Sequence, residues 1–163
     1  MMTQEMCSHK VVERLIETHT TIATMESCTS GLIASMITDT PGASAIFPGG
    51  FVTYANETKR LAGVDAAVIE TYGVYSPECA EAMARAVQKK LDTVLAIGIT
   101  GTTGQVDPNN GDSVLGVAFY CILYGDIAHH YEIHADVAGR SRREIKQLYA
   151  DHVFASLEQL LKV

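Results

Sequence analysis

The sequence predicts an α/β fold, a three-layer α/β/α sandwich with a mixed sheet of about five strands. Segments with helical periodicity alternate along the chain with short segments that are typical of strands. Apolar residues make up 47% of the chain but aromatic residues only 7%, and there are 13 glycines, which favours buried strands and tight turns. The length of 163 residues is that of one ordinary domain, so we expect residues 1–163 to fold as one.

The first part of the chain predicts two helices around a strand. Residues 6–19 and 28–39 each place apolar side chains at helical spacing, so each range predicts a helix. Between them, "TTIATM" alternates polar and apolar residues, which predicts a strand over residues 20–25. The apolar positions are Val11, Val12, Leu15 and Ile16 in the first helix, and Leu32, Ile33, Met36 and Ile37 in the second.

The middle of the chain is rich in turns and then strongly helical. A short helical piece is expected around Ser44, and "GFVTYAN" predicts a second strand. Two short helices follow over residues 57–64 and 65–73, the first of them closed by Gly63. Ser76 is a favourable N-cap and Pro77 a favourable first helical residue, so residues 76–91 predict a longer helix.

The last part of the chain supplies the rest of the sheet and a final helix. The apolar run "TVLAIGITG" predicts a central strand that is buried on both faces. Residues 113–136 predict a hairpin that turns at Gly125 and Asp126. A final helix is expected over residues 141–163. Its inward-facing positions are predicted to be Ile145, Leu148, Val153, Leu157 and Leu160.

Charge and cysteine content argue against several classes of function. The formal net charge of −7 disfavours direct binding of DNA or RNA, which needs a basic surface. The four cysteines form no CxxC pair, so they lack the spacing of a disulfide framework or a zinc site. No apolar segment is typical of a signal peptide or long enough to span a membrane. We therefore expect a cytoplasmic protein without a nucleic-acid or membrane partner.

Three polar clusters lie at the ends of predicted strands. The stretch "ESCTSG" follows the first strand, "TYANETK" spans the end of the second, and "TGTTGQ" follows the apolar central strand. Ligands of open α/β sheets bind outside the carboxyl ends of the strands. The three clusters are therefore predicted to meet at one site, although serine and threonine beside a helix start are also common as caps.

These clusters contain a candidate nucleophile and a candidate base. Ser27 needs a base to attack a substrate, and none of the six histidines lies in a cluster. Lys59 is the nearest candidate, because a desolvated lysine loses its proton near neutral pH, and Tyr54 can relay or donate a proton. The "GTTG" loop suits a phosphate or another polar ligand head, but it matches neither the P-loop nor the dinucleotide fingerprint. A solvated lysine and an ordinary loop are the alternative interpretations.

Two other groups of residues offer different chemistry. Cys28 lies where a helix N-terminus lowers the pKa of a thiol, although a buried, inert cysteine explains its place as well. A strand over "HHYEIHAD" would carry a potential metal-binding set on one face. That set is His130, Glu132, His134 and Asp136. The solvated outer face of an edge strand explains the same pattern, and we favour this interpretation, so no metal site is predicted.

Taken together, several of these stretches resemble the CinA C-terminal domain family, also known as nicotinamide-nucleotide amidohydrolase. They are "ESCTSG", "PGAS", "GGFVTYANETK", "LAGV", "YGVYS" and the Gly-rich turn after "LAIGITG". The resemblance covers residues 9–161 in the family's order. It implies a compact α/β/α sandwich, usually dimeric, that hydrolyses the amide of nicotinamide mononucleotide (NMN) without a metal or organic cofactor. We expect residues 1–163 to form one such domain, without the N-terminal domain that some members carry.

The resemblance also implies roles for individual residues. Ser27 corresponds to the nucleophile, Lys59 to its base, and Tyr54 to a tyrosine that assists the departing ammonia. Backbone N–H groups near Cys28 and Thr29 would then stabilise the oxyanion. The residues expected to hold the substrate are Cys28, Thr29, Ser30, Gly31, Thr100, Gly101, Thr102, Thr103, Gly104 and Arg142.

The chain departs from the family around the expected substrate pocket. Ser30 replaces the first glycine of the usual ESCTGG, and "TTGQVDPNNG" stands where the family has I-A-G-P and further glycines. The family's late arginine corresponds to Arg140, Arg142 or Arg143, and counting back from the final helix favours Arg142. These differences leave an alternative function open, that of a non-catalytic nucleotide-binding member of the family.

Overall fold

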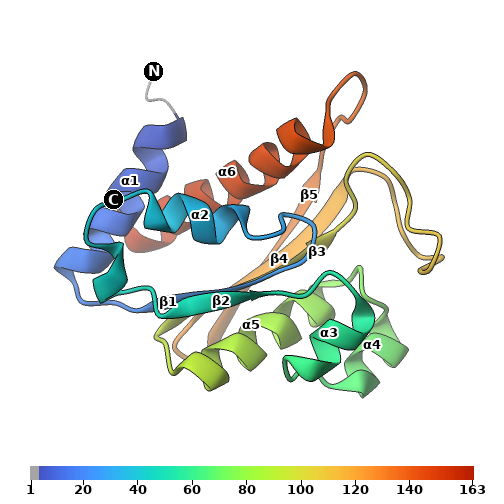
Figure 1. Cartoon of the computed structure of the whole chain (residues 1–163), viewed down its shortest axis with the longest axis horizontal. Coiled ribbons are helices and arrows are strands. Elements are labelled where there is room, and N and C mark those ends of the chain that lie inside the picture. Colours follow the sequence, from blue (N-terminus) through green and yellow to red (C-terminus); the bar gives the residue numbers. More distant parts are fainter. Residues whose placement is uncertain (1–3) are drawn as a thin grey trace.

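Five strands form a single mixed sheet in the order β2-β1-β3-β4-β5 (Figure 1). β1 pairs in parallel with both β2 and β3, whereas β4 runs antiparallel to β3 and to β5. The strands are β1 (Ile22–Glu26), β2 (Gly49–Val52), β3 (Leu95–Gly101), β4 (Val117–Tyr124) and β5 (Ile127–His134). The computed structural model describes residues 4–163, and it describes side chains from Cys7 onward. The predicted mixed sheet is confirmed.

Helices cover both faces of the sheet and complete three layers (Figure 1). One face carries α1 (Gln4–Glu17), α2 (Leu32–Thr38), the short 3₁₀ helix η1 (Ala43–Ala45) and α6 (Arg142–Leu161). The other face carries α3 (Asn56–Leu61), α4 (Ala66–Tyr72) and α5 (Pro77–Leu91). A separate apolar core fills the space on each side, so the inner strands β1, β3 and β4 are buried between them. Within residues 4–163, no helix combines the length and apolar composition that crossing a lipid bilayer requires.

The start of α5 follows the local signals that predicted it, and α6 has a cap of its own. The hydroxyl of Ser76 accepts from the Cys79 amide and Pro77 opens α5. Ser141 and Glu144 form a capping box at the start of α6. Of the five positions predicted to face inward on α6, Ile145, Val153 and Leu157 are fully buried, and Leu148 and Leu160 pack partly exposed against the same core.

Several boundaries differ from prediction; β4, for example, begins at Val117 rather than at residue 113. Three of the differences have local reasons. α1 ends at Glu17 rather than at residue 19, because His19 takes a left-handed conformation with φ 52°. β2 ends at Val52 rather than at residue 56, because the following residues turn into α3. α2 begins at Leu32 rather than at residue 28, because residues 28–31 form turns in which Ser30 has φ 53°.

The topology brings the three polar clusters to one edge of the sheet. β1, β2 and β3 are parallel, so their carboxyl ends lie side by side. β4 is antiparallel to β3, so the loop of residues 102–116 leaves and returns at this same edge (Figure 1). α6 begins close by, since the hydroxyl of Tyr149 donates to the carbonyl of Thr102 over 2.7 Å. This edge therefore carries the candidate site.

Candidate functional site

Ser27 is held at the point where β1 leaves the sheet. Its backbone N–H donates to the carbonyl of Ile99 in β3 over 3.1 Å, which continues the pairing of the two strands by one residue. The Ser27 carbonyl in turn accepts from the Ser30 amide over 3.1 Å and so closes a tight turn. The Ser27 side chain is almost buried, and it lies in the wall of a polar cavity. The hydroxyl is therefore presented to a ligand from a fixed backbone.

The buried side chain of Glu26 caps α2 and anchors this turn. Its oxygens accept from the amides of Gly31, Ile33 and Ala34 at 2.8–3.1 Å and from the hydroxyl of Thr29 at 2.6 Å. An acidic group at a helix N-terminus is stabilised by the free N–H groups and by the helix dipole. Because Glu26 takes these donors, the first amides of α2 are not available to an anionic substrate. Glu26, rather than one of the serines or threonines that follow it, therefore caps α2.

Glu26→Gln is expected to lower the free energy of unfolding by about 2–3 kcal/mol, because its amide nitrogen would face donors that need an acceptor. Urea denaturation at neutral pH measures this loss. The matched control is Glu70→Gln, which makes the same change on the exposed side of α4 and should alter stability by less than about 0.5 kcal/mol. Equal stability of the two variants would show that the Glu26 contacts contribute little.

Lys59 brings its amine to the hydroxyl of Ser27. It lies on α3 with only 2% of its surface exposed, and its Nζ is 3.2 Å from Ser27 Oγ. Nζ also donates to the carbonyl of Thr53 over 2.8 Å, which orients the amine. Burial lowers the pKa of Lys59 below its usual value, because the charged form loses its hydration. A lysine in this environment can accept a proton from serine.

Cys28 follows the serine but has the wrong properties for a nucleophile. Burial raises the pKa of its thiol to about 12, so the thiolate is scarce at neutral pH. The backbone around it is more informative. Among the described residues, no carbonyl or carboxyl oxygen accepts from the amides of Cys28 and Thr29. Both N–H groups interact with the sulfur of Cys28, which is a weak acceptor, so an oxyanion beside Ser27 can compete for them.

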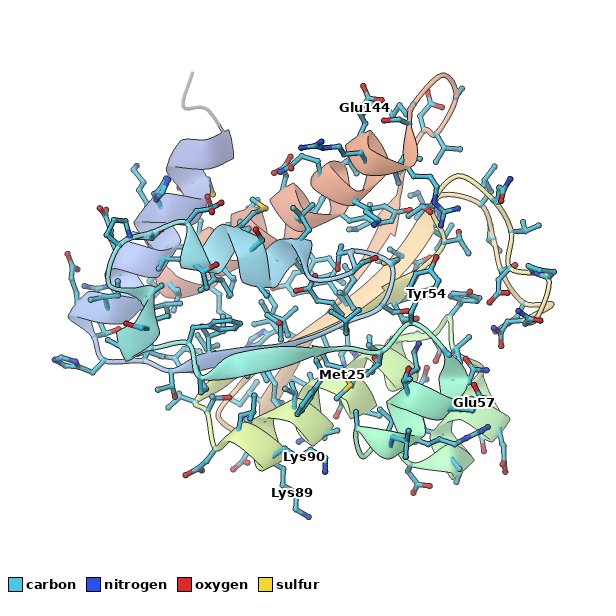
Figure 2. All side chains as sticks on the ribbon, viewed as in Figure 1. Met25, Tyr54, Glu57, Lys89, Lys90 and Glu144 are labelled. Atoms are coloured by element: carbon cyan, nitrogen blue, oxygen red, sulfur yellow. The ribbon has the colours of Figure 1, made fainter. Side chains whose placement is uncertain are left out.

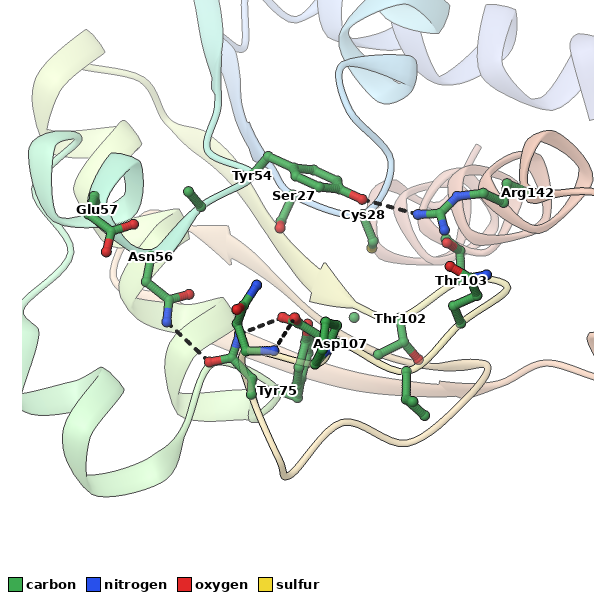
Figure 3. A pocket seen from close by; sticks show the side chains of 17 residues that line it. Ser27, Cys28, Tyr54, Asn56, Glu57, Tyr75, Thr102, Thr103, Asp107 and Arg142 are labelled. Carbon is green, nitrogen blue, oxygen red and sulfur yellow. Dashed lines mark hydrogen bonds between the residues drawn. The ribbon is translucent and has the colours of Figure 1, made fainter.

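A cavity of about 670 Å³ lies over Ser27 (Figure 3). It is lined by Ser27, Cys28, Tyr54, Ala55, Asn56, Glu57, Tyr75, Gly101, Thr102, Thr103, Gln105, Val106, Asp107, Pro108, Asn109, Asn110 and Arg142. Its walls come from the turn after β1, the start of α3, the loop before α5, the loop of residues 102–116 and the start of α6. The volume and the polar lining suit a small polar molecule.

The structure places one of the three candidate arginines in this cavity. Arg142 lies on its wall, and its Nη2 donates to the Tyr54 hydroxyl over 3.0 Å (Figure 3). Arg140 lines a separate groove along α6, and Arg143 lines neither of these two described cavities. The Tyr54 side chain is 61% exposed and projects over the cavity near Ser27 (Figures 2 and 3). A guanidinium and a phenol thus occupy the same rim.

The remaining residues expected to hold the substrate divide into two groups. Gly101, Thr102 and Thr103 line the cavity, and Gly104 lies close to the stem of Arg142. The others have different partners and lie outside the lining. The hydroxyl of Thr29 and the amide of Gly31 donate to Glu26. The hydroxyl of Ser30 approaches the Ser27 carbonyl, and that of Thr100 donates to the Val74 carbonyl over 2.8 Å.

The wall that Asp107 forms is the main part of the cavity that sequence reasoning missed. The carboxyl group of Asp107 accepts from the Tyr75 hydroxyl at 2.7 Å and from the Asn110 side chain at 2.5 Å. It also accepts from the Asn109 amide at 2.9 Å, and Asn56 of α3 donates to Asn110 at 3.1 Å. The stretch "DPNNG" carried the signal, because aspartate before proline and asparagine favours such a turn.

The histidine-rich strand has other partners in the structure. His130 contacts Glu81 of α5 at 2.6 Å, and His134 contacts Glu132 of its own strand at 2.7 Å. Among side chains of residues 7–163, the structure brings together no three histidine, cysteine, aspartate or glutamate residues at metal-binding distance. β5 is an edge strand whose His130, Glu132 and His134 are exposed, in agreement with the solvated face that we favoured.

Two curated relatives are similar in sequence to most of this chain. The "Protein MG115 homolog" of Mycoplasma pneumoniae is 32% identical over 157 residues, which cover 96% of this chain and 98% of that protein. A "CinA-like protein" of Syntrophomonas wolfei is 41% identical over 121 residues, which cover 74% of this chain but 29% of that protein. The chain therefore spans nearly all of the first relative and less than a third of the second.

Solved structures and a family profile agree with these relatives. The competence/damage inducible protein CihA of Agrobacterium tumefaciens superposes with a TM-score of 0.86 at 26% identity, over 98% of this chain and 96% of that one. A CinA superfamily protein of Klebsiella pneumoniae gives a TM-score of 0.88 at 20% identity over 99% of both chains, a likeness of fold alone. The profile of the CinA C-terminal domain matches residues 4–161, and the chain belongs to this family.

Proposed function

We propose that this protein is an amidohydrolase that converts NMN to nicotinic acid mononucleotide and ammonia by serine–lysine catalysis. The observation that carries the proposal is the buried amine of Lys59, 3.2 Å from the hydroxyl of Ser27 in the wall of a polar cavity. Serine nucleophiles need an adjacent base, and this lysine is the base that the site supplies.

The first half-reaction uses the contacts of Ser27 and Lys59. Neutral Lys59 accepts the hydroxyl proton while the Thr53 carbonyl holds the amine in place. Ser27 Oγ then attacks the carboxamide carbon, and the carbonyl oxygen becomes an oxyanion. The amides of Cys28 and Thr29 stabilise this charge, and losing one such donor typically raises a barrier by about 3 kcal/mol.

The second half-reaction releases ammonia and regenerates the serine. The carbon–nitrogen bond breaks as the amide nitrogen gains a proton, which the Lys59 ammonium supplies either directly or through the Tyr54 hydroxyl. Lys59 is then neutral again. The product of this step is an ester of Ser27. Water then attacks the ester carbonyl while neutral Lys59 accepts a proton from it. Lys59 returns this proton to Ser27 Oγ as the bond between Oγ and the carbonyl carbon breaks, and the acid product leaves and loses its own proton to solvent.

Arg142 is positioned to bind the phosphate of the substrate. Arg142→Ala is expected to raise the KM for NMN by about ten- to a hundredfold with a smaller change in kcat, because a charge-assisted contact is lost in both ground and transition states. Steady-state kinetics with NMN and with its uncharged riboside measure the effect, and the riboside should be little affected. Equal losses for both substrates would remove Arg142 from the phosphate site.

A homodimer is the expected assembly. Small α/β domains associate most often as two-fold symmetric dimers. Light scattering on the purified chain measures the assembly directly. A monomer at micromolar concentration would contradict the expectation.

The proposed activity is tested by ammonia release from NMN after treatment of the protein with a chelator. We expect ammonia and nicotinic acid mononucleotide in equal amounts, with activity unaffected by the chelator. Tight binding of NMN without ammonia release would instead favour the non-catalytic nucleotide-binding alternative. Loss of activity with the chelator and its return with zinc would point to a metal mechanism.

A further inference from the structure

The wall of the cavity that faces Ser27 combines a carboxylate with an aromatic ring. Asp107 and Tyr75 lie across the cavity from Ser27 and Tyr54 (Figure 3). The Tyr75 hydroxyl donates to Asp107, so the ring and the carboxylate form one hydrogen-bonded unit. This unit makes no hydrogen bond to Ser27 or Lys59. Burial lowers the pKa of Lys59, and the negative charge of Asp107 opposes part of that lowering. A carboxylate also repels a phosphate, so it needs a different explanation.

The position of the Asp107 carboxylate is fixed by the loop around it. Three donors reach it, from the side chains of Asn110 and Tyr75 and from the Asn109 amide. Its own backbone N–H donates to the Ser113 hydroxyl over 2.9 Å. The hydrogen bond from the Asn110 side chain contributes most to lowering the pKa of Asp107, so the group is ionised at neutral pH. The loop therefore holds a fixed negative charge in the wall of the cavity.

The charges that face the cavity are unevenly distributed. Among the described lining residues, the acidic side chains are Asp107 and Glu57, and the basic one is Arg142. Arg142 lies on the rim with Tyr54, whereas Asp107 lies on the opposite wall (Figure 3). A ligand with an anionic end and a cationic centre complements this arrangement better than a simple anion does.

We propose that Asp107, oriented by Tyr75, recognises a positive charge on the aromatic ring that carries the carboxamide. The site then selects pyridinium amides, whose ring nitrogen is cationic, over uncharged aromatic amides of the same shape. This inference rests on the proposed amidohydrolase function and names the substrate class of the same site. Asp107 acts as a specificity-determining residue, and Tyr75 is a positioning residue for it.

The chemistry of organic cations supports this assignment. A cation on an aromatic system is bound well by an aromatic face together with a nearby carboxylate. In a pyridine mononucleotide, the cationic nitrogen lies between the carboxamide and the ribose phosphate. A carboxamide at Ser27 and a phosphate at Arg142 therefore leave the ring nitrogen in the space that Asp107 and Tyr75 border. The same carboxylate disfavours an anionic ring substituent in that space.

The test compares two ligands that differ in one ring atom. NMN and its benzamide C-nucleotide, in which carbon replaces the ring nitrogen, are titrated calorimetrically into protein carrying Ser27→Ala, which blocks turnover. We expect this protein to bind NMN about tenfold more tightly than the isostere. Adding Asp107→Asn should remove that preference by weakening NMN binding about tenfold while changing binding of the isostere less than about twofold.

Two further variants separate charge recognition from loop integrity. Tyr75→Phe keeps the ring and removes the donor to Asp107, so it should reduce the preference for NMN about threefold. Glu57→Gln removes the other carboxylate of the lining, which is exposed in the first turn of α3, and should leave the preference nearly unchanged. An equal loss of preference in Glu57→Gln would assign recognition to the general field of the cavity and overturn the role of Asp107.

The remaining outcomes are equally decisive. No preference for NMN over its isostere, or equal weakening of both ligands by Asp107→Asn, would overturn the proposal. A preference that depends on Asp107, in a wild-type protein that releases no ammonia from NMN, would support the recognition of the ring and reject the amidohydrolase function. The two proposals therefore fail separately.

Discussion

Ser27→Ala is expected to lower the rate of ammonia release from NMN by about 10⁴-fold or more, because it removes the nucleophile on which both half-reactions depend. The substitution deletes one oxygen atom, and the backbone contacts of Ser27 with Ile99 and Ser30 do not need the hydroxyl. The fold should therefore survive. Ammonia assays and circular dichroism on the same preparation measure the two effects together.

Cys28→Ala is the matched control for this experiment. The two residues are adjacent, both are nearly buried, and the thiol of Cys28 is protonated at neutral pH. Cys28→Ala should retain most of the activity, because only the Cys28 backbone amide is needed at the oxyanion. If Cys28→Ala abolished turnover and Ser27→Ala did not, the nucleophile would be Cys28.

Lys59→Met is expected to lower kcat/KM by about 10²- to 10⁴-fold, which is the usual contribution of a general base. In the wild type, kcat/KM should rise as the pH rises through the lowered pKa of Lys59, because only the neutral amine can accept the serine proton. That rise should be absent from the residual activity of the variant. Kinetics over a range of pH measure both effects.

Stability distinguishes this loss from a damaged fold. A lysine whose pKa is lowered by folding binds a proton more weakly in the native state than in the unfolded chain. Its burial therefore destabilises the fold below that lowered pKa, and stability rises with pH between the lowered value and the ordinary one. Lys59→Met should remove this dependence without lowering stability at neutral pH.

Lys89→Met, on the exposed end of α5 (Figure 2), should change neither activity nor stability appreciably. A variant of Lys59 that is active but unstable would contradict the role of base.

The sheet and most helices could be predicted because their signals are local and periodic. The apolar run of β3 and the Ser76–Pro77 start of α5 are examples. The start of α2 was predicted too early because its cap is Glu26, whose carboxylate accepts from amides five to eight residues later in the chain. Sequence spacing identifies residues that can cap a helix, but it does not show which of several polar neighbours does so.

The candidate site was predictable where residues follow parallel strands and less so elsewhere. The ends of such strands must meet, and they bring Ser27 next to Lys59. Thr100 was expected in the pocket, but alternation along β3 directs its hydroxyl to Val74 instead. The wall that contains Asp107 depends on a non-periodic loop and on its contact with Tyr75, which lies 32 positions earlier in the chain. Pairings of this kind become visible only in the folded structure.

The central claim, that Ser27 is acylated by the substrate, is tested most directly by adding hydroxylamine to the reaction with NMN. Hydroxylamine competes with water for an acyl-enzyme and converts it to a hydroxamate, whereas it competes poorly for an amide that water attacks directly. We expect the hydroxamic acid of the mononucleotide to form at the expense of nicotinic acid mononucleotide, and to disappear in Ser27→Ala. Ammonia release that continues with carboxylate as its only product, however much hydroxylamine is added, would contradict the account.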